Sequence, residues 1–384
     1  MRHIYLDHNA TTPVLPEVLE VMLQYYRAEY GNPSSVHRYG RQARVAVDDA
    51  RDYVAQLLGA PAASITFCSG GTEANNTILK GVAAALRDRG QHIITSQIEH
   101  PCVLDTCAAL ARQGYTISYV PVDAHGVVDP EAVREALTEE TILVSIMHAN
   151  NEVGTLQPIA EIARLAQARG VLLHTDAVQS VGKIPLNVVE LGVDFLTFSG
   201  HKLYAPKGIG GWYARSRTAL PPLLHGGHQE RGLRSGTENV AAIAALGKAC
   251  EIAWRDMASE GERQHQLQQR LEHGLRERIP DVRIQGEGAA RLPSTTNAAF
   301  ANVEGETLLM GLDLQGVYIS TGSACSSGSL EPSHVLQAMG VPEAYLHGAL
   351  RLSLGRATSH ADIEYVLEML PGIVEQARML FPAV

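Results

Sequence analysis

Four short apolar runs of this sequence end in polar side chains that are able to bind a ligand. These side chains are His100, Asn150, Asn151, Asp176, Gln179, Ser199, His201 and Lys202. If the runs are parallel strands, their carboxyl ends meet at one edge of a sheet, which is where open α/β sheets bind ligands. The polar end of any one run is equally well explained as a helix cap or a turn. Four such ends together favour one shared ligand site.

Lys202 has the most specific chemistry of this group. It follows the apolar run "DFLTFSGH" and precedes the Pro- and Gly-rich stretch "LYAPKGIGG". Burial lowers the pKa of an amine, and a neutral amine can form a Schiff base with an aldehyde. The plainer interpretation is a solvated lysine on a surface loop.

An aldehyde cofactor with a pyridine ring and a phosphate needs a carboxylate, a stacking ring and a phosphate cradle. Asp176 can supply the carboxylate, and His100 can stack on the ring. The stretch "SGGTEANN" can hold phosphate, because Gly70 and Gly71 let the backbone approach and a helix start follows at Thr72. By itself, Gly-Gly-Thr is also typical of an ordinary turn between a strand and a helix.

The elements that must position these residues alternate along the chain. From about 60 to 215, six apolar runs predict buried strands, and helix-period stretches lie between several of them. This alternation predicts a largely parallel sheet with helices on both faces. A long helix over 237–279 leads to a C-terminal third of mixed elements. We therefore expect an α/β protein with a large domain at 12–250 and a small α+β domain formed by 1–11 and 251–384.

Composition excludes several classes of protein. The 384 residues include 31 basic and 41 acidic side chains, and the resulting net charge of −10 disfavours nucleic acid as a partner. No apolar run approaches the ~20 residues of a membrane-spanning helix, and the start lacks the pattern of a signal peptide. We therefore expect a cytoplasmic protein with no membrane partner. The five cysteines form no C-x-x-C pair, which disfavours a disulfide framework or a zinc ribbon.

Cys325 stands in a run of small residues, "STGSACSSGS", between Gly322 and Gly328. Such a run fills a core poorly and bends easily. A thiol on such a segment can reach two places, and the plainer interpretation is a Gly/Ser turn with an incidental thiol. The other cysteines are predicted to be structural. They are Cys68, Cys102, Cys107 and Cys250.

Eight motifs of the chain resemble those of the pyridoxal-phosphate-dependent cysteine desulfurases, most closely the NifS branch and also IscS-like members. The motifs are "YLDHNATTP", "GNPSSVH", "GGTEANN", "HANNEVGT", "HTDAVQS", "SGHKLYAPKG", "GGHQERGLRSGTENVAAI" and "GSACSSGSLEPSHVL". The resemblance extends from Tyr5 to about Arg356 and departs at His8, where the family has Asn. It implies a fold-type I architecture, similar to aspartate aminotransferase, with a mainly parallel seven-stranded sheet.

The resemblance also implies a role for each site residue. Lys202 would bind pyridoxal 5'-phosphate covalently, His100 would stack on its ring, and Cys325 would take up sulfur as a persulfide. The implied cofactor-binding residues are Gly71, Thr72, Asn151, Asp176, Gln179, Ser199, His201, Lys202 and Thr237, of which the last would reach across a homodimer. The implied substrate-binding residues are Asn32, Asn151 and Arg351. Without the family, Arg351 is an ordinary charge before a strand and Asn32 is a turn residue.

The implied reaction converts L-cysteine to L-alanine and passes sulfur from Cys325 to an iron–sulfur scaffold protein, with nitrogen fixation favoured as the setting. No resident metal is expected, although Cys325 can meet an iron–sulfur cluster during transfer. Three alternatives stay open. They are a selenocysteine lyase or aminotransferase of the same fold, a sulfur-binding scaffold without turnover, and a thiol hydrolase that uses Cys325 and His334.

Overall fold

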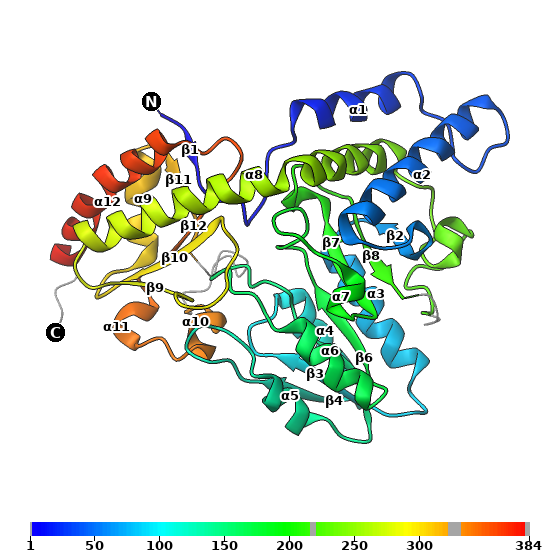
Figure 1. Ribbon diagram of the computed structural model, residues 1–384, viewed down its shortest axis with the longest axis horizontal. Coiled ribbons are helices and arrows are strands. Elements are labelled where there is room, and N and C mark those ends of the chain that lie inside the picture. The colour runs from blue at the N-terminus through cyan, green and yellow to red at the C-terminus, as the bar shows by residue number, and fades with distance from the viewer. Residues whose placement is uncertain (1, 216–219, 322–331, 381–384) are drawn as a thin grey trace.

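A seven-stranded sheet forms the centre of the larger part of the molecule (Figure 1). The computed structural model describes residues 2–215, 220–321 and 332–380. In sheet order, the strands are β2 (Ile65–Cys68), β8 (Gly210–Ala214), β7 (Phe195–Ser199), β6 (Leu172–Asp176), β5 (Thr141–Ser145), β3 (His92–Ser96) and β4 (Thr116–Val120). β8 runs antiparallel to β2 and β7, and the other neighbours are parallel. The predicted α/β class and its mainly parallel seven-stranded sheet are confirmed.

The inner strands are the apolar runs of the sequence. β3, β5 and β7 are buried at every residue, because a parallel sheet is covered by helices on both faces. β4 was not among the predicted strands. It lies at the edge of the sheet and only its last residue, Val120, is buried, so its sequence "TISYV" lacks a continuous apolar signal.

Helices connect the strands and start close to the strand ends. They are α1 (Pro16–Arg27), α2 (Arg38–Leu58), α3 (Gly71–Ala85), α4 (Pro101–Ala111), α5 (Pro130–Ala136), α6 (Ile159–Ala168) and α7 (Val188–Leu191). α3 begins three residues after β2 ends, and α4 begins shortly after β3 with His100 as its N-cap. The starts of α3 and α4 therefore lie at the carboxyl edge of the sheet.

The smaller part of the molecule, built from the C-terminal third of the chain together with β1, contains two small sheets. In one, β10 (Thr295–Phe300) pairs antiparallel with β9 (Val282–Ile284) and β12 (Ala349–Ser353). In the other, β1 (Ile4–Tyr5) pairs in parallel with β11 (Val317–Tyr318). The helices of this part are α9 (Gly305–Leu314), α10 (His334–Ala338), α11 (Glu343–Leu346) and α12 (His360–Leu380).

The N-terminal segment after β1 connects the two parts. Asp7 forms a bridge to Ser353 of β12, and the backbone N–H of Thr12 donates to the carbonyl of His201 at 2.9 Å. The chain start therefore runs past the end of β7, where the site residues of that strand lie.

α8 (Val240–Arg278) is a single helix of 39 residues that packs into two hydrophobic cores. Its first half, including Ala242 and Ala253, belongs to the core beside the large sheet, and Leu267 and Leu275 belong to the core of the C-terminal part. Figure 1 shows it crossing from one part to the other. The long helix predicted over this region is confirmed, with bounds that differ by a few residues.

Candidate active site

A cavity of about 230 Å³ lies at the carboxyl edge of the large sheet, beside the starts of α3 and α4. It is lined by Ala10, Gly71, Thr72, Asn75, His100, Cys102, Met147, Ala149, Asn151, Asp176, Val178, Gln179, Ser199, His201 and Lys202. Polar residues at the ends of all four apolar runs therefore line one cavity. Of the nine residues predicted to bind a cofactor, eight line this cavity and Thr237 lines another.

Lys202 ends a short 3₁₀ turn, η2 (Gly200–Lys202), which follows β7 directly. Its Nζ donates to the backbone carbonyl of Ala10 at 2.8 Å and to that of Asn9. Both acceptors come from the N-terminal segment. Carbonyl oxygens accept a hydrogen bond from a charged or a neutral amine, so the same contacts hold Lys202 in either protonation state.

Asp176 ends β6 and is buried, with 6% of its surface exposed. Its Oδ2 accepts from Asn75 Nδ2 at 2.6 Å, and its Oδ1 accepts from the backbone N–H of Val178 at 2.9 Å. These donors fix the carboxylate at the cavity wall. Sequence reasoning did not single out Asn75, although it follows Gly71 by four residues and so lies on the same face of α3.

The buried side-chain oxygen of Asn75 indicates that the cavity binds a polar ligand. Asn75 is fully buried, and its Oδ1 has no hydrogen-bond partner among the described residues. A buried polar atom without a partner costs free energy unless something binds it. Because Asn75 also lines the cavity, a ligand with a donor can satisfy this atom.

His100 caps α4 and lies against Cys102. Its Nδ1 accepts from the backbone N–H of Cys102 at 3.2 Å and lies 3.0 Å from Cys102 Sγ. Burial lowers the pKa of His100, while the negative charge of Asp176 opposes this shift. A neutral ring that can take up or release a proton therefore stands at the cavity.

Cys102 was predicted to be a structural cysteine, and the structure places it in the wall of the cavity. Asn75 Nδ2 lies 3.1 Å from its sulfur. Burial, together with the charge of Asp176, raises the pKa of Cys102 to about 12. The thiol is therefore protonated at neutral pH and is a poor nucleophile.

The start of α3 forms one end of the cavity and suits an anion. The first N–H groups of a helix have no partner within it, and α3 has 15 residues whose dipole adds positive charge at this end. A β-carbon at Gly71 would lie 2.8 Å from Val178 Cγ2, so glycine keeps this end open. Thr72 and Ser199 add hydroxyl groups to the lining. These features fit a phosphate group.

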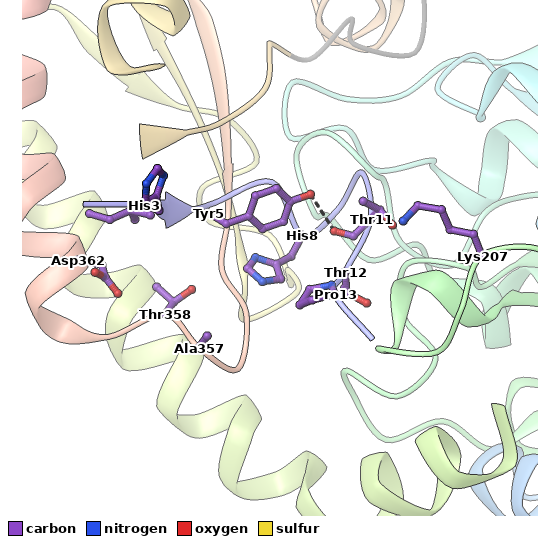
Figure 2. A pocket seen from close by; sticks show the side chains of 11 residues that line it. His3, Tyr5, His8, Thr11, Thr12, Pro13, Lys207, Ala357, Thr358 and Asp362 are labelled. Carbon is purple, nitrogen blue, oxygen red and sulfur yellow. Dashed lines mark hydrogen bonds between the residues drawn. The ribbon is translucent and has the colours of Figure 1, made fainter. Parts of the chain in front are cut away.

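The N-terminal segment also lines a second cavity of about 420 Å³ (Figure 2). Ala10 faces the first cavity, whereas Thr11 lines the second. Thr11 Oγ1 lies 3.2 Å from His201 Nδ1, and Tyr5 donates from its hydroxyl to the carbonyl of Thr11 at 3.0 Å. Burial, followed by the charge of Lys202, lowers the pKa of His201 to about 4.

His8, the position that departs from the family pattern, is buried on the outer side of this segment. Its Nδ1 lies 3.1 Å from the carbonyl of Ser353, and its ring packs edge-on against Tyr5. Burial lowers the pKa of His8 to about 4. The imidazole therefore fills space as a neutral ring and supports the segment that carries Asn9 and Ala10.

Arg351 of β12 is buried beside the cavity, with 1% of its surface exposed. Its Nη1 donates to the carbonyl of Asn151 at 3.1 Å, and its Nη2 donates to Asp7 at 2.8 Å. Its Nε has no hydrogen-bond partner among the described residues. A buried guanidinium with an unused donor suits a ligand carboxylate.

Two buried acids lie behind the site and were missed by sequence reasoning. Glu99 accepts from Ser96 Oγ at 2.7 Å, and burial raises its pKa to about 8. Glu152 accepts from Ser333 Oγ, and burial raises its pKa to about 7. His334 Nε2 lies 3.0 Å from the carbonyl of Glu99. The start of α10 is therefore attached to the site from two sides.

Three predicted residues lie elsewhere. Asn32 is in the turn between α1 and α2, where its side chain accepts from the backbone N–H of Ser34 at 2.9 Å. Thr237 lines a cavity of about 130 Å³ together with Cys68 and Ser69. Cys325, with its predicted persulfide and its contact with an iron–sulfur cluster, lies outside the described residues.

The described part of the chain also bears on membrane spans and metal sites. None of its helices is long and apolar enough to cross a membrane. Within the same residues, His, Cys, Asp and Glu side chains form no group of three or more that could hold a metal ion.

The sheet and the site at its carboxyl edge define a fold-type I enzyme of the kind that works with pyridoxal phosphate. The model of the aminotransferase class-V family matches residues 4–366, and the chain belongs to that family, in its cysteine desulfurase branch. Members of this branch use pyridoxal phosphate.

Individual relatives cover almost the whole chain. A protein of Dictyoglomus turgidum named cysteine desulfurase IscS is 50% identical over 381 residues, which are 99% of this chain and 97% of the relative. A cysteine desulfurase IscS of Methanosarcina thermophila is 48% identical, over 99% of this chain and 94% of the relative. A solved NifS-like protein is 40% identical and superposes with a TM-score of 0.92, over 98% of this chain and 100% of that structure.

Proposed function

We propose that this chain is a cysteine desulfurase that takes sulfur from L-cysteine, leaves L-alanine and holds the sulfur as a persulfide on Cys325. The observation that carries the proposal is the cavity in which Lys202, Asp176 and the start of α3 meet. Arg351 lies beside this cavity with an unused donor. The names of the relatives support the substrate.

Pyridoxal 5'-phosphate fits this cavity, bound covalently to Lys202. When bound, the cofactor supplies an electron sink that stabilises negative charge on the substrate carbon next to the amine. Asp176 would hold the proton of the ring nitrogen, Gln179 and Asn151 would bind the ring hydroxyl oxygen, and His100 would stack on the ring. The phosphate would be held by Gly71, Thr72, Ser199 and His201.

The protein's own residues bind the substrate and move its protons. Arg351 binds the carboxylate of L-cysteine, and Asn32 of the turn before α2 helps to bind the substrate. Lys202 would carry the proton of the substrate α-carbon, because its amine lies in the wall of the cavity. His100 exchanges a proton with the substrate sulfur, which a neutral ring is able to do.

Cys325 takes the sulfur in a step that needs no external oxidant. Its thiolate attacks the substrate sulfur, so an S–S bond forms and the Cβ–S bond breaks. The electron pair of the broken bond stays with the organic part, which gains protons and leaves as L-alanine. The persulfide then passes its outer sulfur to an iron–sulfur scaffold protein. Any contact of Cys325 with an iron–sulfur cluster belongs to this transfer.

A homodimer is part of the proposal, with Thr237 of each subunit reaching the phosphate site of the other. α1, α2 and the turn between them carry many exposed large apolar side chains, which favours burial against a second copy. These are Leu19, Tyr26, Tyr30, Val36, Tyr39 and Val45. Mixing Lys202→Ala subunits with Thr237→Ala subunits is expected to restore part of the activity, because one of the two sites then receives both native residues.

The organisation of the chain is proposed as a large domain at 12–250 and a small domain formed by 1–11 and 251–384. The two cores along α8 support this division. We place the enzyme in the cytoplasm, where a reducing environment keeps the thiol of Cys325 available. A general or a nitrogenase-linked scaffold fits as acceptor, and the NifS-like sequence favours the second.

Incubation of the purified protein with L-cysteine tests the proposal. We expect stoichiometric L-alanine, a persulfide at Cys325 by mass spectrometry, and a visible absorbance band that disappears in Lys202→Ala. A 2-oxo acid in place of alanine would indicate an aminotransferase, and turnover of L-selenocysteine alone would indicate a selenocysteine lyase. A colourless protein without turnover would indicate a scaffold, and hydrolysis of thioesters without the cofactor would indicate a thiol hydrolase.

A further inference from the structure

Lys183 is a second amine close to the site and has no role in the reaction described above. It follows Gln179 by four residues, in the turn after β6. Its Nζ donates to Gln179 Oε1 at 3.1 Å and to Asn9 Oδ1 at 3.1 Å. Gln179 lines the cavity, so Lys183 touches a wall residue from behind.

These contacts form a closed network of hydrogen bonds. Gln179 Nε2 donates to the backbone carbonyl of Asn9 at 3.0 Å, and Lys202 Nζ donates to that same carbonyl. Lys183 then connects the side chains of Gln179 and Asn9. One residue of the N-terminal segment, Asn9, therefore touches both lysines and the glutamine.

Asn9 is fixed from the opposite side by the small sheet. Its Nδ2 donates to Thr295 Oγ1 at 2.9 Å, and its backbone N–H donates to Ser353 Oγ at 2.9 Å. Asn9 itself is buried, with 1% of its surface exposed. The oxygen of its side chain must therefore face Lys183, and the network has a rigid support.

Lys183 and the carbonyl of Asn9 together fix the orientation of the Gln179 amide. An amide can turn over and exchange its oxygen for its NH₂ group, and only its partners fix the orientation. The amine of Lys183 meets two oxygens and donates to both. It holds the Gln179 oxygen on its own side, which leaves the NH₂ group toward Asn9 and the cavity.

We propose that Lys183 is a positioning residue that keeps Gln179 with a hydrogen-bond donor toward the ring oxygen of pyridoxal phosphate. The proposal rests on the proposed function, because it takes pyridoxal phosphate as the ligand of the cavity. Burial lowers the pKa of Lys183 to about 7, and the positive charges of Lys202 and Arg351 add to this shift. Both the charged and the neutral amine carry the two hydrogens that the network uses.

Titration of the apo-protein with pyridoxal 5'-phosphate tests the proposal through the Kd and the absorbance maximum of the bound cofactor. We expect Lys183→Met to raise the Kd about tenfold and to shift the maximum, because an amide that is held only by the Asn9 carbonyl turns over more readily and presents its oxygen part of the time. Lys183→Arg keeps two donors and is expected to restore most of the affinity. Lys80→Met, on the partly exposed face of α3, is the matched control and is expected to match the wild type.

A double-mutant cycle separates positioning from a general effect on packing. If Lys183 acts through Gln179, adding Lys183→Met to Gln179→Leu raises the Kd no further. Independent, additive effects would overturn the proposal, as would a Lys183→Met variant with the Kd and spectrum of the wild type. A wild-type apo-protein that does not bind pyridoxal 5'-phosphate would instead reject the proposed function.

Thermal unfolding of each apo-protein shows whether a variant is folded. If Lys183→Met does not fold, Lys183→Gln takes its place in the cycle, because it removes the charge and shortens the reach of the donor. In that case too, the proposal is overturned if the effects of Lys183→Gln and Gln179→Leu on the Kd are additive, and it is supported if they are not.

Discussion

The buried guanidinium of Arg351 forms an ion pair of 2.8 Å with the partly exposed carboxylate of Asp7, beside the cavity. The guanidinium also holds the carbonyl of Asn151, and its Nε lacks a partner within the described residues. Asp7 and Asn151 thus orient the group before a substrate arrives, and the donor that is left has a fixed direction.

We expect Arg351→Lys to raise KM for L-cysteine about 10- to 100-fold with a smaller effect on kcat. A lysine ammonium keeps the charge but loses the planar set of donors that matches a carboxylate. Steady-state kinetics of alanine formation measures the change. Arg283→Lys, on the short strand β9, is the control. Unchanged KM in Arg351→Lys would remove Arg351 from the substrate site.

Lys202→Ala is expected to remove both the visible absorbance band and alanine formation, because no other lysine lines the cavity among the described residues. Lys207→Ala, an exposed lysine of the second cavity, is expected to keep the band. Absorbance spectra of the two purified variants, recorded at equal protein concentration, provide the comparison. A Lys202→Ala protein that retains the band would show that another amine binds the cofactor.

Brief alkylation with iodoacetamide at about pH 8 is expected to label Cys325 before the other cysteines, because the thiolate is the reactive form. Burial raises the pKa values of Cys68, Cys102, Cys107 and Cys250 to about 12. Peptide mass spectrometry measures the order of labelling. We expect Cys325→Ser to keep the visible band and lose the persulfide, and Cys102→Ala to keep both. Equal labelling of Cys102 would contradict its raised pKa.

Glu99 is expected to make the protein less stable as pH rises. Its pKa is raised from 4.5 to about 8 in the folded protein, so the folded state holds a proton that the unfolded state releases between these values. Stability therefore falls through this interval, by up to about 1.4 kcal/mol for each pH unit. Glu99→Gln is neutral at every pH and is expected to flatten the curve of unfolding temperature against pH.

The matched control for Glu99 is Glu131→Gln, which removes an exposed acid of α5. Its slope between pH 4.5 and about 8 is expected to match that of the wild type. An equal slope in Glu99→Gln and the wild type would mean that Glu99 is ionised in the folded state.

The inner strands were predictable because burial on both faces leaves a continuous apolar run. β4 was not predicted because it is a half-exposed edge strand and lacks such a run. The residues that line the cavity from strand ends were predictable for the same reason: Asp176 and Lys202 follow recognisable runs, and the carboxyl edge of a parallel sheet is a known place for ligands.

The supporting residues could not be found in this way. Asn9 meets Lys202 across 193 positions of sequence and does so through its backbone carbonyl, which every residue type possesses. Lys183 donates to the side-chain oxygen of Gln179, and no local sequence pattern distinguishes it from a solvated lysine. Asn75 stood inside a quoted motif, but only the fold shows that it reaches Asp176.

The continuous course of α8 limits how this enzyme can work. Its 39 residues span about 60 Å at 1.5 Å per residue, and both cores are built onto it. A closing movement of one core toward the other that bends α8 in its middle would strain the backbone hydrogen bonds of the helix there. α8 therefore opposes any movement of one core relative to the other that requires the helix to bend.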